Sequence, residues 1–286
     1  MANLLAHDSP FSESENRVLE QRPDLSLHAI LSGKFASNYE SYTSDQFVLR
    51  DAWVGAKTDA DRALGKKESN GVFLGKDEYL IERYRSPAET EMESRVSAME
   101  AFGSAMPGLR KYVMLAPTAA GLLRDKLPAY ASVGDELADL ERVRLALPPD
   151  IRFVDVYPVL DAVREAPIYY KTDHHWTTNG AYYAYRELCR QMGLAPQAKE
   201  SFDIREGTDR FYGSLYSKSG FRHLQPDRID LYLPKMTSKL EVAYMDEGRI
   251  TDSMYEPENL GKKDKYAVFL NGNHGLVRIT TDGRCG

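Results

Sequence analysis

Short apolar runs alternate with amphipathic stretches between residues 88 and 195, and this alternation constrains the fold more than any other feature of the chain. Apolar spacing of three and four residues predicts helices, and short apolar runs predict buried strands. The helices are expected over 88–106, 134–147 and 157–165, and the strands over 112–116 and 151–155. Strands that alternate with helices pair in parallel. We therefore predict an α/β core over 88–195, with a parallel sheet and flanking helices.

The segments on either side of this core have a different character. Residues 1–26 are polar and interrupted by prolines, which predicts an extended arm. Residues 27–64 have the apolar spacing of helices, and 71–82 of a β-hairpin, so 27–87 is expected to form a helical and hairpin entry region. Residues 196–286 are less regular and β-rich, with strands expected near 229–233, 240–245 and 266–270. We predict that 27–286 forms a single α/β domain.

Composition narrows the class of protein further. Apolar residues make up 42% of the chain and charged residues 28%, as expected of a folded globular protein. The net charge of −6 argues against nucleic acid as a partner, because phosphate binding requires a concentrated basic surface. No run of about 18 apolar residues and no basic start followed by an apolar run is present, so neither a membrane span nor a cleavable signal is expected. Cys189 and Cys285 leave the disulfide state open.

The best candidate for chemistry is the segment Thr172-Asp173-His174-His175-Trp176. In an extended segment, Asp173 and His175 point to the same side, while His174 points away. A carboxylate beside an imidazole bonds its Nδ1–H, fixes the tautomer and leaves Nε2 to deprotonate a hydroxyl. We therefore interpret Asp173 and His175 as two members of a Ser-His-Asp triad.

Residues around this pair are candidates for support. Thr177 or Thr178 is expected to cap a helix that runs to about 193, which places the pair at the junction of a loop and a helix N-terminus. Thr172 and Trp176 would support the pair locally, and Tyr170 and Trp176 would line a substrate pocket. Aromatic side chains also pack in cores, so this interpretation stays open.

A metal site is a second interpretation of the same residues, Asp173, His174 and His175. Asp-His-His offers oxygen and nitrogen ligands suited to zinc or manganese, and it resembles the motif of the DHH phosphoesterases on three letters. That family needs further aspartate motifs upstream, and none is found here. We therefore expect neither a metal nor another cofactor.

Beyond these local patterns, the chain resembles the bacterial DHHW family, which is similar to the SGNH-hydrolase-like domains of alginate O-acetyltransferases. The resemblance covers almost all of the chain and rests on several motifs in the right order. They lie at residues 11–17, 42–51, 70–77, 79–81, 116–118, 169–177 and 211–220. The resemblance implies an SGNH-hydrolase-like, flavodoxin-like parallel sheet with flanking helices, incomplete in this chain.

The same resemblance implies a function. The implied reaction is acetyl transfer or acetyl-ester hydrolysis on a polysaccharide or other glycan of the bacterial cell envelope. The implied location is extracytoplasmic, at the cell surface or anchored to the membrane. The implied partner is a membrane-bound O-acyltransferase. The motif assigns orientation of the base to Asp173 and the base itself to His175, with His174 in the variable middle place. Asn271 and Gly272 would donate hydrogen bonds to an oxyanion, although Asn-Gly is also typical of a plain turn.

The resemblance further implies a serine nucleophile in an Asp-Ser motif, after a strand that follows a segment like 271–275. No Asp-Ser pair of this chain suits that role, because Asp8-Ser9 lies in the polar arm and Asp252-Ser253 in a polar loop. We therefore expect the nucleophile beyond Gly286, a chain truncated at both ends, and no serine-dependent hydrolase activity from these 286 residues. A non-catalytic carbohydrate-binding or assembly protein is the alternative, for which the 18 tyrosines speak.

Overall fold

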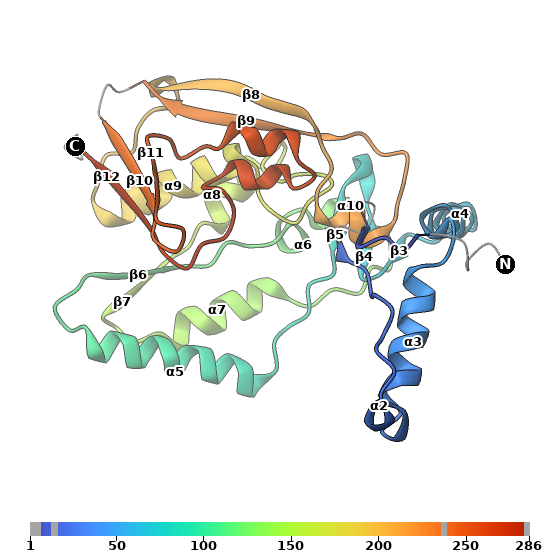
Figure 1. The fold of residues 1–286 in the computed structure, drawn as a ribbon. Helices are drawn as coiled ribbons and strands as arrows, with labels where there is room; N and C mark the ends of the chain where they lie inside the picture. The colour runs from blue at the N-terminus through green and yellow to red at the C-terminus, as the bar shows by residue number, and fades with distance from the viewer. Residues whose placement is uncertain (1–6, 13–16, 236–238, 283–286) are drawn as a thin grey trace.

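The computed structural model describes residues 7–12, 17–235 and 239–282 (Figure 1). It is a mixed α/β structure with several small sheets in place of one large one. Residues 1–6 and 13–16 of the predicted extended arm, and Cys285 with its disulfide state, lie outside the described residues.

The N-terminal region contains a short antiparallel pair and three helices. Its elements are β1 (Phe11–Ser12), β2 (Arg17–Val18), α2 (Leu27–Leu31), α3 (Lys34–Asp45) and α4 (Arg50–Ala63). The helices predicted over 27–64 are thus confirmed, but their apolar stripe is largely on the surface, with Leu31 86% and Trp53 64% exposed. No helix among the described residues has both the length and the apolar character needed to cross a membrane.

The predicted hairpin is confirmed as part of a three-stranded antiparallel sheet. Its strands are β3 (Glu68–Ser69), β4 (Val72–Leu74) and β5 (Leu80–Glu82), and η1 (Lys76–Glu78) joins the last two. Gly71 has a φ of +76°, a left-handed conformation that glycine adopts without strain, and it turns the chain from β3 into β4. All three residues of β4 are buried, so this hairpin is part of the core.

The alternation predicted for the middle of the chain is confirmed. The elements are α5 (Glu89–Ala105), β6 (Lys111–Met114), α6 (Ala119–Leu122), η2 (Arg124–Lys126), α7 (Glu136–Ala146), β7 (Ile151–Val154) and α8 (Tyr157–Asp161). Strands β6 and β7 pair in parallel from Lys111↔Ile151 to Met114↔Val154. Within the described ranges this parallel sheet has these two strands, so the larger parallel sheet that we expected is shown only in part.

Strand β6 is less buried than its apolar sequence predicts. Tyr112, Val113 and Met114 are half-buried, whereas a central parallel strand is covered on both faces. The reason is that β7 is its only strand neighbour among the described residues. One side of β6 faces an open groove, described below.

The C-terminal part contains more regular structure than we predicted. Its elements are α9 (Thr178–Met192), η3 (Lys199–Ser201), β8 (Phe202–Phe211), α10 (Ser214–Ser219), β9 (Asp227–Pro234), β10 (Leu240–Tyr244), β11 (Arg249–Thr251), η4 (Pro257–Gly261), η5 (Lys265–Val268) and β12 (Val277–Thr281). The strands predicted near 229–233 and 240–245 are confirmed by β9 and β10. The long antiparallel pair β8–β9 and the sheet β11–β10–β12 frame this region.

The strand predicted near 266–270 is wrong. Residues Lys265–Val268 form the 3₁₀ helix η5, and the backbone then turns through positive φ angles at Leu270 and Asn271. A single isolated bridge, Tyr255↔Phe269, is the only strand-like pairing there within the described residues. The apolar run forms a helical turn in which Val268 is buried and its neighbours are half-buried, and a short apolar run does not reveal by itself whether it forms a helix or a strand.

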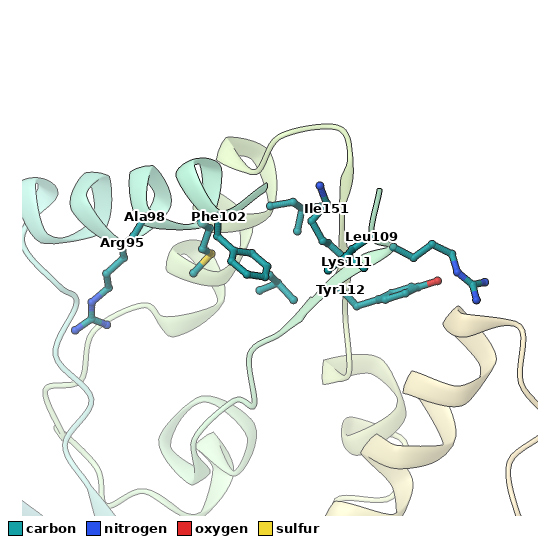
Figure 2. Close-up of a pocket in the computed structure, with 10 residues that line it drawn as sticks. Arg95, Ala98, Phe102, Leu109, Lys111, Tyr112 and Ile151 are labelled. Carbon is teal, nitrogen blue, oxygen red and sulfur yellow. The ribbon is translucent and has the colours of Figure 1, made fainter. Parts of the chain in front are cut away.

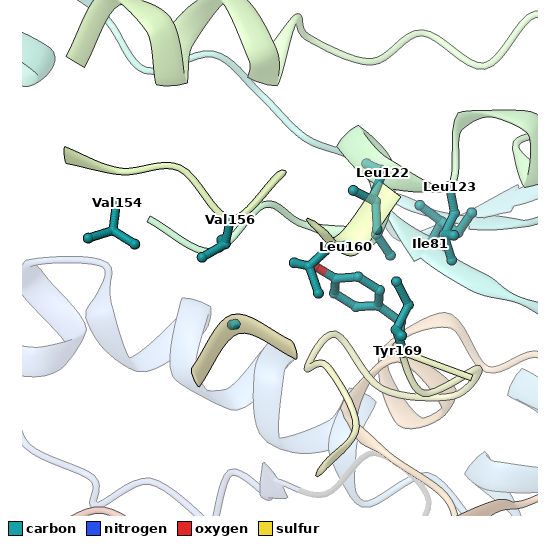
Figure 3. Packing of buried hydrophobic residues seen from close by; sticks show 11 residues of the cluster. Ile81, Leu122, Leu123, Val154, Val156, Leu160 and Tyr169 are labelled. Carbon is teal, nitrogen blue, oxygen red and sulfur yellow. The ribbon is translucent and has the colours of Figure 1, made fainter. Parts of the chain in front are cut away.

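Three clusters of buried side chains hold the elements together. One gathers Ile81 with residues of α6, β7 and α8, and Figure 3 shows Leu160 and Tyr169 packed within it. The second joins the β4–β5 hairpin to α10, and the third lies under β8, β9 and η5. Tyr169 belongs to the first cluster and Tyr170 to the third. Two consecutive tyrosines therefore fix the entrance of the Asp173–His175 loop in two different cores.

Candidate active site

The segment that carries Asp173 and His175 is a tight loop closed at its base. Tyr169 and Trp176 face each other in an isolated antiparallel bridge, and Thr177 N–H donates to the Ile168 carbonyl over 2.9 Å. Between them the chain bends continuously, so the extended conformation that we expected is wrong. The two side chains meet because the loop folds back on itself.

Asp227, at the start of β9, anchors this loop from a distance in sequence. Its carboxylate accepts the N–H groups of Lys171 and Thr172 over 2.8 and 2.7 Å, and the Thr172 hydroxyl over 2.6 Å. Burial raises the pKa of Asp227, and these hydrogen bonds act in the opposite direction. Thr172 is fully buried and also accepts the Gly213 N–H over 3.0 Å. The local support expected from Thr172 is therefore a link between the loop, β9 and the start of α10.

The carboxylate of Asp173 is buried and its oxygens have several partners. Oδ1 accepts the His175 N–H over 2.9 Å and the His175 Nδ1–H over 2.6 Å, and Oδ2 accepts the Ser214 N–H over 2.7 Å. Burial acts against ionisation, but the hydrogen bonds from His175 and Ser214 outweigh it and lower the pKa of Asp173 to about 2. Asp173 is therefore an anion that fixes His175 at neutral pH.

Gly213 makes room for this carboxylate. A Cβ atom at position 213 would lie 2.2 Å from the Asp173 Cβ and 2.4 Å from Oδ2. Its backbone is extended, with a φ of −86°, so the requirement is for space and not for an unusual conformation. The absence of a side chain lets the start of α10 approach Asp173 closely enough for the Ser214 hydrogen bond.

The imidazole of His175 is held on both faces and on one edge. Its centroid lies 3.9 Å from that of His174 and 4.1 Å from that of Tyr266, whose ring is inclined by only 12°. Nδ1 faces Asp173, and the described residues provide no hydrogen bond to Nε2. The side chain is 37% exposed. This arrangement leaves Nε2 as the nitrogen that can take a proton from a substrate or a nucleophile.

His174 does not point away from the pair, contrary to our expectation. Its ring stacks on His175, and its Nδ1 lies 2.7 Å from the Ser214 Oγ. Burial lowers the pKa of His174, although nearly half of the side chain is exposed. The middle residue of the motif is therefore part of the site.

Tyr170 and Trp176 lie close to the loop but serve mainly in packing. Tyr170 is 1% exposed, and its ring packs edge-on against Phe211 and Tyr266. Trp176 is half-buried against the first core cluster. Tyr170 therefore supports the ring of Tyr266, and the ring of Tyr266 stacks on His175.

Asn271 and Gly272 form a turn at the end of η5. Both have positive φ angles, and the Asn271 side chain accepts from Asn259 over 3.0 Å. None of their described hydrogen bonds reaches Asp173 or His175. The turn is thus the role that the structure describes, and the oxyanion role stays a prediction.

Asp173, His174 and His175 offer ligand atoms that lie within 4.8 Å of one another, which a metal ion could bridge. However, the Nδ1 atoms that face this point already bond Asp173 and Ser214. A cation would have to displace the hydrogen bond that orients His175, and the tetrahedral site typical of zinc needs a fourth ligand. The donor set therefore fits an Asp–His pair better than a metal centre.

Sequence reasoning missed four residues of this site. Gly213 and Ser214 belong to the motif at 211–220, so the resemblance contained a signal for them that we did not use. Asp227 and Tyr266 lie 54 and 93 residues beyond Asp173, with no local pattern to connect them to it.

An open, mostly apolar groove of about 590 Å³ lies elsewhere, between α5 and the flank of β6. Figure 2 shows Phe102 of α5 facing Tyr112 and Leu109 across it. Neither Asp173 nor His175 lines this groove. It is separate from the chemistry of the loop.

The lowered pKa of Asp173 predicts how the loop contributes to stability as pH falls. A group whose pKa is depressed by folding stabilises the protein above its ordinary pKa, near 3.8, and this contribution is lost as pH falls toward 2. The shift corresponds to about 2 kcal/mol. We expect the stability difference between the protein and an Asp173→Asn variant, measured by urea unfolding, to shrink by about that amount between pH 6 and pH 2. Because both proteins contain Asp227, its opposite shift cancels, and a pH-independent difference would contradict the prediction.

Comparison with known proteins adds to this geometry. A family model described as DHHW protein matches residues 145–284. No curated protein sequence matches the chain. Among solved structures, a DHHW family protein from Eubacterium siraeum has a TM-score of 0.63 at 20% identity, covering 76% of this chain and 73% of its own.

PatB1 from Bacillus cereus, solved with a sulfonyl adduct, has a TM-score of 0.57 at 16% identity and covers 72% of each chain. The O-acetyltransferase domain of AlgJ from Pseudomonas putida has a TM-score of 0.44 at 20% identity, covering 58% of this chain and 66% of its own. The chain therefore shares the fold of the first two proteins.

Proposed function

We propose that this chain, whose residues 145–284 match the DHHW family model, provides the base of an acetyl-transfer or acetylesterase site that acts on a cell-envelope glycan. His175 is the general base and Asp173 holds it. The two parallel strands β6 and β7 belong, in this proposal, to an SGNH-hydrolase-like sheet.

The single observation that supports the proposal is the hydrogen bond of 2.6 Å between His175 Nδ1 and the Asp173 carboxylate. It fixes the tautomer in which Nε2 has the lone pair, as general-base catalysis on a hydroxyl requires. When Nε2 takes a proton, the positive charge on the ring faces an anion at one edge and the Tyr266 ring on one face. Both contacts stabilise an imidazolium.

The glycan and the acetyl donor follow from the family resemblance. An O-acetylated envelope polysaccharide is the proposed acceptor or substrate, and a membrane-bound O-acyltransferase is the proposed source of acetyl groups. We propose an extracytoplasmic place of action, because that is where such glycans are modified. Of the tyrosines that suggested a sugar-binding module, Tyr169, Tyr170, Tyr182, Tyr232 and Tyr244 are buried and do not offer a ring face to a sugar.

Nuclear magnetic resonance of the histidine side chains tests this function without requiring turnover. An O-acetylated alginate oligosaccharide should shift the imidazole signals of His175, and the chemically deacetylated oligosaccharide should shift them less, because the acetyl ester would lie beside Nε2. His28, on the exposed helix α2, serves as the control that should not move.

Two results would count against the proposal. If neither oligosaccharide moves His175, the loop is not a glycan site. If both move it equally, or if binding persists unchanged in an Asp173→Asn variant, the protein recognises sugar without regard to the ester, and the non-catalytic binding module is favoured.

A further inference from the structure

The hydroxyl of Ser214 lies beside the imidazole pair. Its Oγ is 2.7 Å from His174 Nδ1, within the range found between serine nucleophiles and their bases. Ser214 is the first residue of α10, and its N–H group donates to Asp173 Oδ2 over 2.7 Å. The serine is therefore fixed to the same carboxylate that orients His175.

His174 has the properties of a base for this hydroxyl. Burial lowers its pKa, which keeps the ring neutral at neutral pH, and a neutral ring protonated at Nε2 presents the Nδ1 lone pair to Ser214. His174 Nδ1 lies 3.9 Å from Asp173 Oδ1, so a proton taken up at Nδ1 would face an anion. The His174 side chain is 47% exposed, so a small reagent has access to the pair.

We propose that Ser214 is a nucleophile that takes up an acyl or sulfonyl group, with His174 as its base. This departs from the expectation, drawn from the sequence, that no serine of these residues can act. It goes beyond the function proposed above, because His175 takes no part in it.

The acylation step conserves atoms and charge. Ser214 Oγ forms a bond to the carbonyl carbon of an ester while its proton passes to His174 Nδ1. The resulting oxyanion collapses, the bond to the leaving alcohol breaks, and the alcohol takes the proton from His174. Water then hydrolyses the acyl-serine, which releases the carboxylic acid and restores the hydroxyl. With a sulfonyl fluoride, Oγ bonds to sulfur, fluoride leaves, and the proton on His174 is lost to solvent.

The other serines of α10 provide matched comparisons. Ser217 and Ser219 are 7% and 1% exposed, whereas Ser214 is half-buried. The Ser219 hydroxyl donates to the Tyr216 carbonyl and accepts the Phe221 N–H. Neither has a described bond to a histidine. Ser214 therefore differs from both in exposure and in its contact with His174, and the His174→Gln variant separates these two causes.

Labelling with phenylmethylsulfonyl fluoride, followed by mass spectrometry, tests the proposal. Trypsin should release residues 211–218 as one peptide, and fragment ions separate Ser214 from Ser217. We expect one adduct, on Ser214, with Ser217→Ala labelled like the unmodified protein and Ser214→Ala unlabelled. A His174→Gln variant keeps a hydrogen-bonding side chain but no base, so labelling should slow by about 100-fold.

Two outcomes overturn the proposal: no adduct on Ser214 in the unmodified protein, or a His174→Gln variant that is labelled at the same rate. Circular dichroism confirms that each variant is folded before labelling. Failure of the glycan proposal is distinguishable, because an adduct on Ser214 does not depend on any shift of the His175 signals.

Discussion

An Asp173→Asn substitution is expected to remove the single tautomer of His175. The amide has one acceptor oxygen where the carboxylate has two, and Asp173 now accepts from His175 N, His175 Nδ1 and Ser214 N. Without the anion, nothing fixes the proton at Nδ1, and a base in the wrong tautomer lowers the rate of a serine-protease triad by about 10⁴-fold. Acetate release that depends on His175 should fall by about this factor.

The nitrogen chemical shifts of the His175 ring report the tautomer directly. The unmodified protein should show one protonated nitrogen, Nδ1, at a pH where the ring is neutral, and the variant should show a mixture or the other tautomer. Asp209→Asn, at a carboxylate that is 70% exposed on β8, is the matched control. An unchanged tautomer in the Asp173 variant would mean that the 2.6 Å contact does not orient the base.

A Gly213→Ala substitution is expected to destabilise the protein by about 3 kcal/mol, because it forces a methyl group into the space of Asp173. The added Cβ would lie 2.2 Å from the Cβ of Asp173. The carboxylate of Asp173 accepts three hydrogen bonds that hold the side chain in place, so the start of α10 must move away. That movement also breaks the Gly213–Thr172 hydrogen bond. Urea unfolding at pH 7 measures the loss.

Gly108→Ala is the control for this substitution. Nothing lies within 4 Å of a Cβ at position 108, and its backbone is not left-handed, so a change within about 0.5 kcal/mol is expected. If the two variants are equally stable, the close approach of Gly213 to Asp173 is not required for folding. The Gly213 variant should also lose labelling at Ser214, since the serine moves with the glycine.

The parts of the fold that were predicted correctly are those whose signal is local. The alternation from α5 to α8 follows from apolar spacing within each element, and Thr177 caps α9 as expected, its hydroxyl accepting the Gly180 N–H over 3.2 Å. Thr118 stands at the N-cap of α6 but donates its hydroxyl to Glu136 instead of capping. This partner lies 18 residues away, and no local pattern specifies it.

In the candidate site, too, the features with a local signal were predicted and those that depend on distant residues were not. The pairing of Asp173 with His175 was predicted from their spacing, although the conformation that produces it was not. The loop bends because Asp227 binds two of its N–H groups and Leu80 N–H donates to the Lys171 carbonyl over 2.7 Å. These partners come from β9 and β5, and no pattern within residues 169–176 specifies them. The orientation of His174 was mispredicted and Tyr266 was missed for that reason.

The anchor provided by Asp227 sets an order for the assembly of the protein. The loop from 169 to 176 is synthesised more than 50 residues before the carboxylate that gives it shape, and contacts between such distant residues form late, because closing a long loop costs entropy before any contact repays it. The loop that holds His175 is therefore expected to take its final shape late, when Asp227 reaches Lys171 and Thr172. A nascent chain that ends before Asp227 contains the whole Asp-His-His-Trp motif but lacks the carboxylate that shapes its loop.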